Sequence, residues 1–188
     1  AVVQRLVGAR PGVVDGKGGA GDQAGGAFQA GVGGLGIAPE VAHGAAGAVG
    51  SMVAQLARVA GAYVIATGRA GDREKALDFG AQEFVDLEND KLEDIGGVDL
   101  VFDVIGGDIQ KRSAQLVRPG GTLVTIVGPQ PAKPASGLAI DFVVESDRAQ
   151  LAEIVQRVRD GRLRPNIGKV STLDDAVATF NSSERHAG

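Results

Sequence analysis

A glycine-rich turn between a short apolar strand and an amphipathic helix is the feature that most constrains how this chain folds. The turn occupies residues 43–50, where the sequence reads HGAAGAVG. Val41–His43 is predicted to end a strand there, and apolar residues recur at helical spacing after it. Such a turn brings backbone amides and the positive end of a helix dipole to the end of a strand. The sequence therefore predicts an anion-binding turn at a helix start.

The turn follows the glycine pattern of dinucleotide-binding folds, with Ala45 in place of the usual first glycine. Gly47 is expected to let the backbone approach a pyrophosphate, and Gly50 to let the helix pack closely on the strand. The predicted pyrophosphate-binding residues are Ala46, Gly47, Ala48 and Val49, with Ser51 as a further amide donor. A turn whose small residues serve packing alone is the alternative.

An arginine follows the next predicted strand, in the sequence Thr67-Gly68-Arg69. Folds that bind NAD carry an acidic residue for the ribose 2′-hydroxyl about 20 residues after the turn. Here Gly68 and Arg69 occupy that place, so Arg69 and Arg73 become candidates for a 2′-phosphate, and NADP(H) becomes the predicted cofactor. Solvated surface arginines are the alternative, and the nearby Asp72 argues against the phosphate.

Strand and helix patterns alternate from residue 40 to residue 160, which predicts an α/β fold with a doubly wound parallel sheet of the Rossmann type. Arg118–Gly121 is predicted to be a turn. The predicted strands are Val41–His43, Tyr63–Thr67, Glu83–Asp86, Asp99–Asp103, Thr122–Val127 and Ile140–Val144. The predicted helices carry the apolar stripe Val49, Met52, Val53, Leu56, Ala60, then cover Arg73–Phe79 and Ile109–Leu116, and end with the stripes around Leu151–Val158 and Leu173–Phe180.

Small and apolar residues follow the fourth and fifth predicted strands. Ligands of open α/β sheets bind at the carboxyl ends of the strands. Val104, Ile105 and Val127 are therefore predicted to line the nicotinamide half of a cofactor site. For the residues after each of these two strands taken alone, a purely structural turn is an equally good interpretation.

The sequence indicates no catalytic side chain and no metal site. It contains no cysteine and only two histidines, and His43 is expected to be a hydrogen-bonded residue at a strand end. Tyr63 is followed four residues later by Thr67 and not by lysine, so the Tyr-Lys pair of short-chain dehydrogenases is missing. Asp86, Asp99 and Asp103 are expected to cap strand ends.

Charge and hydropathy exclude two classes of partner. The net charge of −4 does not suit nucleic acid, and no apolar run approaches the roughly 20 residues of a membrane span. A cytoplasmic protein with a small-molecule substrate is the resulting expectation.

The first 38 residues differ from the rest of the chain. Residues 1–36 contain 12 Gly and 6 Ala, and they show no sustained helical or strand periodicity. We expect residues 1–38 to be irregular or disordered, and residues 39–188 to form the dinucleotide-binding domain with a C-terminal helical tail. A GC-rich coding sequence read out of frame would give a similar composition. Glu40 is anomalous in a central strand, which either begins at Val41 or is weakened there.

The ordered set of motifs resembles the cofactor domain of the medium-chain dehydrogenase/reductase superfamily, in its zinc-free quinone oxidoreductase branch. Matching segments are HGAAGAVG at residues 43–50, GAYVIATG at 61–68, FGA at 79–81, VFDVIGG at 101–107, RPGGTLV at 118–124 and DGRLRP at 160–165. The resemblance implies hydride transfer from NADPH to a quinone or enone in a cleft between two domains.

The chain also departs from this family. Residues 1–38 do not resemble the family's GroES-like catalytic domain, which is therefore expected to be absent, and Ala48 stands where relatives usually have glycine. The chain alone is thus expected to bind cofactor better than it turns over substrate. A non-catalytic module for dinucleotide binding or assembly is the alternative, and a homodimer would pair through the edge strand near Ile140–Val144.

Overall fold

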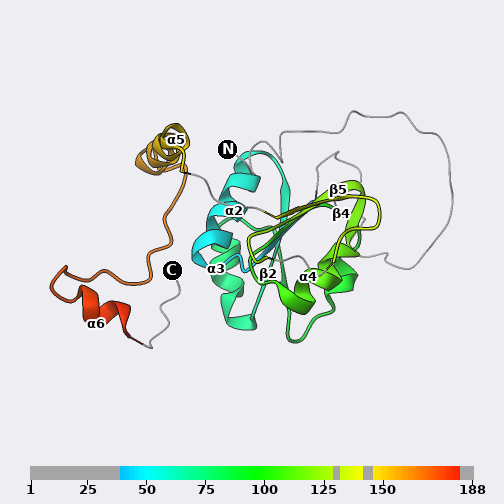
Figure 1. Ribbon diagram of the computed structural model, residues 1–188, viewed down its shortest axis with the longest axis horizontal. Coiled ribbons are helices and arrows are strands. Elements are labelled where there is room, and N and C mark those ends of the chain that lie inside the picture. The colour runs from blue at the N-terminus through cyan, green and yellow to red at the C-terminus, as the bar shows by residue number, and fades with distance from the viewer. Residues whose placement is uncertain (1–38, 129–131, 142–145, 183–188) are drawn as a thin grey trace.

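A central strand, β1 (Pro39–His43), organises a six-stranded parallel sheet in the computed structural model, which describes residues 39–128, 132–141 and 146–182 (Figure 1). The strand order is β3-β2-β1-β4-β5-β6, and every neighbouring pair is parallel. This is the doubly wound order, with the switch point between β1 and β4, so the predicted fold class is confirmed. The other strands are β2 (Tyr63–Gly68), β3 (Glu83–Asp86), β4 (Val98–Asp103), β5 (Val117–Thr125) and β6 (Leu138–Asp141).

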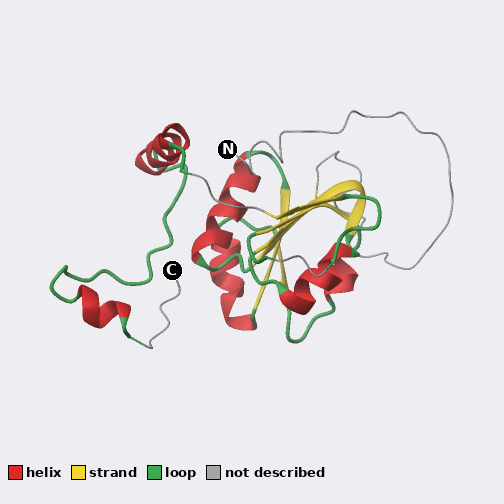
Figure 2. Ribbon diagram, viewed as in Figure 1, coloured by secondary structure: helices red, strands yellow, loops and turns green. Residues whose placement is uncertain are grey.

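Helices cover both faces of the sheet (Figure 2). One face carries α2 (Ala48–Val59) and α3 (Arg73–Asp78), which is preceded by the short 3-10 turn η1 (Ala70–Asp72). The other face carries η2 (Leu92–Ile95) and α4 (Gly107–Ala114). Because the crossovers are right-handed, the helices change face where the chain returns from β3 to β4 and the strand order reverses.

The sheet divides the hydrophobic core into two clusters. Along β1, Val41 faces the cluster under α4 and η2, whereas Ala42 faces the cluster under α2. Along β5, Leu123 and Val124 make the same alternation, and all four side chains are at most 2% exposed. Because both faces are buried, consecutive residues in the central strands are apolar, as at Val64–Ala66 of β2 and Leu100–Phe102 of β4.

Two predicted boundaries at the β5 edge need correction. The predicted turn at Arg118–Gly121 lies inside β5, because Val98 pairs with Val117 while Leu100 pairs with Thr122, and this shift in register lets the intervening residues bulge without ending the strand. The predicted last strand, Ile140–Val144, begins earlier in the structure as Leu138–Asp141, and residues 142–145 lie outside the described residues.

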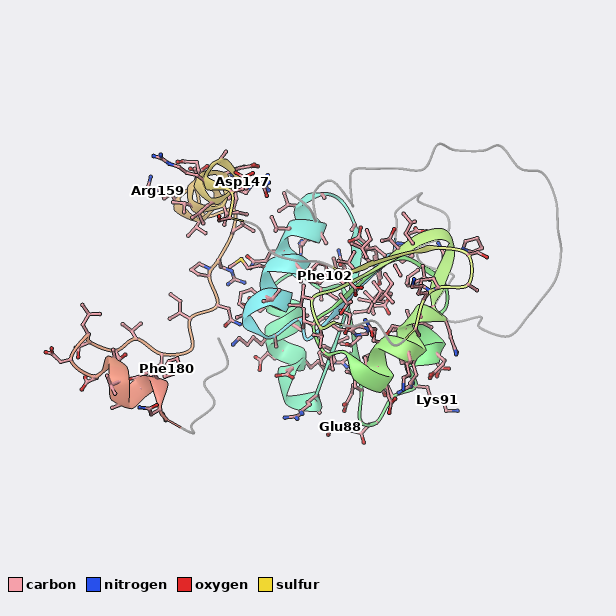
Figure 3. All side chains as sticks on the ribbon, in the orientation of Figure 1. Glu88, Lys91, Phe102, Asp147, Arg159 and Phe180 are labelled. Atoms are coloured by element: carbon pink, nitrogen blue, oxygen red, sulfur yellow. The ribbon has the colours of Figure 1, made fainter. Side chains whose placement is uncertain are left out.

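The C-terminal tail leaves the sheet after β6 and stands beside it (Figure 1). α5 (Arg148–Arg159) matches the predicted amphipathic helix, and Asp147 caps its start by accepting from two backbone amides. The last helix is shorter than predicted: α6 covers Ala176–Phe180, and Leu173 precedes it. Phe180, on α6, lies apart from the sheet and is 89% exposed, whereas Phe102 of β4 lies in the core (Figure 3).

Two further expectations concern residues 1–38 and the presence of a membrane-spanning segment. The predicted irregular segment, residues 1–38, lies outside the described residues. Within the described part of the chain, none of the helices has the length and apolar character needed to cross a membrane.

Glu40 belongs to β1, which begins at Pro39, so the strand does not start after it. Glu40 is 5% exposed, and burial together with the charge of Asp99 raises the pKa of its carboxyl to about 7. The strand therefore forms with a buried acid, and the ionised form of that acid destabilises the fold.

We expect Glu40→Gln to stabilise the protein at high pH. A carboxyl whose pKa is raised on folding binds more protons in the folded state, so its contribution to stability decreases as the pH rises from about 4.5 to about 7. At pH 8 the variant should unfold with a free energy about 3 kcal/mol higher than the wild type. Urea denaturation at pH 5 and pH 8 measures this difference, and equal gains at the two pH values would contradict the assignment.

Candidate functional site

The predicted glycine-rich turn lies at the carboxyl end of β1, at the switch point of the sheet. Gly44 adopts a positive φ of 62°, and its amide donates to the Thr67 carbonyl on β2 at 2.9 Å. Its own carbonyl accepts from the Gly47 amide at 2.9 Å, which closes a tight turn. α2 begins at the next residue, with Gly47 as its N-cap in an extended conformation.

The first turn of α2 presents backbone amides without partners of their own. Within the described backbone, the amides of Ala48, Val49 and Gly50 find no acceptor, as expected for the first turn of a helix. No side chain caps this helix start, and its first turn carries no acidic residue. Ala48 and Val49 are exposed. These amides and the helix dipole favour an anion.

Three residues predicted to bind the pyrophosphate, Ala46, Gly47 and Ser51, make hydrogen bonds within the protein instead. The prediction that the Ser51 amide is free to bind an anion is wrong, because this amide donates to the Gly47 carbonyl at 3.0 Å in the first helical hydrogen bond. The Gly47 amide donates within the turn although the residue is exposed, and Ala46 is buried at 5% exposure, so both shape the turn. The Ala46 carbonyl accepts from the side chain of Asn166 at 2.8 Å, a contact that sequence reasoning missed.

The helix approaches the strand so closely that Gly50 has no room for a side chain. A Cβ on Gly50 would lie 2.2 Å from the Gly44 carbonyl oxygen and 2.9 Å from the Cα of Ala45. Both groups are backbone, so neither can move without displacing the turn. The predicted role of Gly50 in close helix–strand packing agrees with this geometry.

A buried hydrogen-bonded histidine supports the turn from below. His43 is fully buried; its Nδ1 lies 2.6 Å from the Thr67 hydroxyl and its Nε2 lies 2.6 Å from the Ser113 hydroxyl. Since the Ser113 hydroxyl donates to the Ile109 carbonyl, Nε2 carries the proton and Nδ1 accepts from Thr67. Burial lowers the pKa of His43 to about 4, against the charge of Asp103, so the ring is neutral at pH 7. It joins β1, β2 and α4 and has the expected structural role.

A second buried group, Asp103, fixes the loops that follow β4 and β5. Its Oδ1 accepts from the amides of Ile105 and Gly106 at 3.0 Å each, and its Oδ2 accepts from the Thr125 hydroxyl at 2.9 Å. The Thr125 oxygen in turn accepts from the Val127 amide at 3.0 Å. Asp103 is thus a cap for two strand ends, as predicted.

These contacts bring the predicted nicotinamide-side residues to the same edge as the turn. Val104 packs against Gly44, where a Cβ would lie 2.8 Å from its Cγ2, and Val127 packs against Gly106 in the same way. Ile105 is 41% exposed and Val127 is 38% exposed. The structure therefore places an apolar surface in the loops that follow β4 and β5, with Val104 against Gly44 of the turn.

The predicted 2′-phosphate residues lie at the end of β2, on the other side of the turn. Gly68 ends the strand and is buried, and Arg69 follows it with a side chain that is 75% exposed, 3.6 Å from the carboxylate of Glu88. The Arg69 amide donates to Asp72 at 3.1 Å, so this carboxylate serves the local turn. Arg73 begins α3 and lies over the Phe84 ring, 5.8 Å from its centroid.

Residues 48–157, which include α2 and most of the sheet, match the family model described as zinc-binding dehydrogenase. The chain belongs to this family. The resemblance to the cofactor domain of medium-chain dehydrogenases and reductases is thereby confirmed. In the part of this family member that the structure describes, no three His, Asp or Glu side chains gather as metal ligands.

Solved structures of related proteins share the fold. The quinone oxidoreductase of Thermus thermophilus, also solved as a complex with NADPH, is 27% identical, with a TM-score of 0.63 over 77% of this chain and 52% of that chain. An alcohol dehydrogenase superfamily protein of Novosphingobium aromaticivorans is 26% identical, with a TM-score of 0.65 over 81% of this chain and 54% of that chain.

A curated relative, the probable mitochondrial zinc-binding oxidoreductase of Arthroderma benhamiae, is 33% identical over 132 residues, 63% of this chain and 40% of the relative. The NADP-dependent oxidoreductase of Cochliobolus heterostrophus is 27% identical over 72% of this chain and 47% of the relative. The chain thus spans about half the length, or less, of these relatives.

We expect Gly50→Ala to destabilise the protein and to disrupt the turn. The added methyl group would overlap the Gly44 carbonyl, and overpacking of this kind costs about 2 kcal/mol or more. Gly71→Ala is the matched control, because a Cβ there meets open space at an ordinary φ. Thermal denaturation of both variants checks the expectation; equal melting temperatures would show that the approach of α2 to the turn is not tight.

Proposed function

We propose that this domain binds NADP(H) for an oxidoreductase that transfers hydride from NADPH to a quinone or enone. The observation that carries the proposal is the row of free amides at Ala48, Val49 and Gly50, held at the switch point of a doubly wound sheet. The NADPH complex of the Thermus thermophilus relative supports the choice of cofactor.

The described residues fit a pyrophosphate at the start of α2. The three amides converge with the helix dipole, and the missing side chain at Gly50 leaves the turn close against the helix. No carboxylate of the first helical turn opposes a diphosphate. Ala46 and Gly47 hold the turn, while Ala48 and Val49 form its exposed surface. Ala48 is exposed, and its amide has no backbone acceptor despite the methyl group at this position.

Arg69 and Arg73 are proposed to bind the 2′-phosphate, with Gly68 keeping the strand end free of a side chain. The Arg69–Glu88 pair is exposed and loosely spaced, so it contributes little and yields readily to a phosphate. Arg69 directly follows β2, and Arg73 begins α3, where its guanidinium donates to the Phe84 carbonyl at 3.4 Å. Paired charge-assisted hydrogen bonds would then favour NADPH over NADH.

The apolar surface of Val104, Ile105 and Val127 is proposed to support the nicotinamide ring. Asp103 holds these residues in place through the loop amides, and it does not itself reach the exposed surface, because it is fully buried. The bound cofactor supplies the hydride, and these residues orient the ring and exclude water on one side. No side chain of the described residues is assigned a role as acid or base.

We expect Arg69→Ala and Arg73→Ala to weaken NADPH binding about ten-fold each while leaving NADH binding nearly unchanged. Arg159→Ala, on the exposed end of α5, is the matched control. Fluorescence titrations with both cofactors measure the ratio of the two dissociation constants. Parallel losses for NADPH and NADH would place the phosphate contact elsewhere.

Turnover distinguishes an enzyme from a binding module. Because the chain spans about half of its relatives, we expect it to bind NADPH without efficient reduction of an added quinone. NADPH oxidation, followed by the loss of the cofactor's near-ultraviolet absorbance with a soluble quinone present, is the assay. Rapid oxidation would show that the described residues and the rest of this chain suffice for catalysis.

A homodimer through the β6 edge is proposed as the assembly. β6 pairs on one side with β5, and Leu138 on it is 63% exposed. Edge strands of this kind pair across a two-fold axis. Sedimentation should give twice the monomer mass of 19.0 kDa, and Leu138→Lys should give the monomer. Leu151→Lys, also 63% exposed, is the control; a monomeric wild type would refute the dimer.

A further inference from the structure

A short segment near the C-terminus, residues 163–166, lies along α2 and reaches the glycine-rich turn; we refer to it as the strap. At its end the Asn166 side chain donates to the Ala46 carbonyl at 2.8 Å, across 120 positions of sequence. We propose that Asn166 is a positioning residue for the cofactor pyrophosphate and acts through the peptide that joins Ala46 to Gly47. The proposal rests on the proposed binding of NADP(H).

Both ends of this one peptide unit are fixed. Its carbonyl, on Ala46, accepts from Asn166 at 2.8 Å, and its amide, on Gly47, donates to the Gly44 carbonyl at 2.9 Å. The next amide along the chain belongs to Ala48, the first residue of α2. The orientation of the peptide therefore sets where the free amides of the helix start point.

Rotation of this peptide would reverse its dipole at the anion site. The carbonyl oxygen carries partial negative charge, and turning it toward the helix start would oppose a diphosphate. Because the Asn166 side chain donates to the Ala46 carbonyl oxygen, this oxygen is held toward the strap and away from the helix start. Asn166 thus acts by keeping a repulsive group away, with no contact to the cofactor required.

The strap is itself anchored by contacts that fix Asn166. The main chain of Arg164 both donates to and accepts from the Gln55 side chain on α2, at 2.8 and 3.0 Å. The Arg164 guanidinium binds Asp78 at 2.9 Å, and Leu163 is 1% exposed. The asparagine therefore approaches the turn from a pre-organised backbone.

We expect Asn166→Leu, which keeps the size but removes the donor, to weaken NADPH binding about five-fold. Asn166→Asp should weaken it more, because a carboxylate would face the Ala46 carbonyl and repel the diphosphate. The affinity for 2′-AMP, which has the 2′-phosphate but no pyrophosphate, should stay at the wild-type value. The chain contains no tryptophan, so NADPH fluorescence reports binding directly, and 2′-AMP is measured by calorimetry.

Asn181→Leu, an exposed asparagine at the end of α6, is the matched control and should bind both ligands as the wild type does. Unchanged NADPH affinity in Asn166→Leu, or equal losses for NADPH and 2′-AMP, would overturn the positioning role while leaving the proposed function intact. Failure of the wild type to bind NADPH would overturn the proposed function and this inference together.

Discussion

The contact between α2 and the end of β1 is the constraint on which the rest of the structure depends. Gly50 lies so near the Gly44 carbonyl that even one methyl group would overlap it. This approach lets the helix begin directly above the strand, at the place in the sheet order where the crossovers diverge. Ala48 and Val49 are exposed there with amides that have no backbone acceptor, which is the basis of the proposed anion site.

Beneath that contact the fold buries titratable groups whose effects on stability oppose one another. Burial lowers the pKa of His43 to about 4, so its contribution to stability is lost as the pH falls below about 6.5. Burial raises the pKa of Glu40 to about 7, so its destabilising charge is removed over nearly the same range of pH. The two residues belong to one strand. Because their contributions to the free energy of unfolding change with pH in opposite directions, they limit the pH dependence of stability around the turn.

The order of strands, the start of α2 and the apolar residues in the loops after β4 and β5 were predictable, because each follows from local spacing and from the connection rules for parallel sheets. The amide of Ser51 was assigned wrongly, since the position in sequence did not show where helical hydrogen bonding begins. The bulge within β5 depends on its pairing with β4, which no local pattern reveals. Asn166 was missed because its partner is a backbone carbonyl, that of Ala46, 120 residues away. Hydrogen bonds of that kind leave no signal in a single sequence.

The most direct test of the anion site is a ¹⁵N–¹H NMR titration of the chain with NADPH. The amides of Ala48, Val49 and Gly50 should show the largest shifts, because a diphosphate would become their hydrogen-bond acceptor. Smaller shifts are expected at Arg69 and Val127, which are proposed to lie beside the ribose and the nicotinamide. Saturating NADPH that leaves the three α2 amides unmoved, or that shifts residues at the far end of α2 instead, would contradict the account.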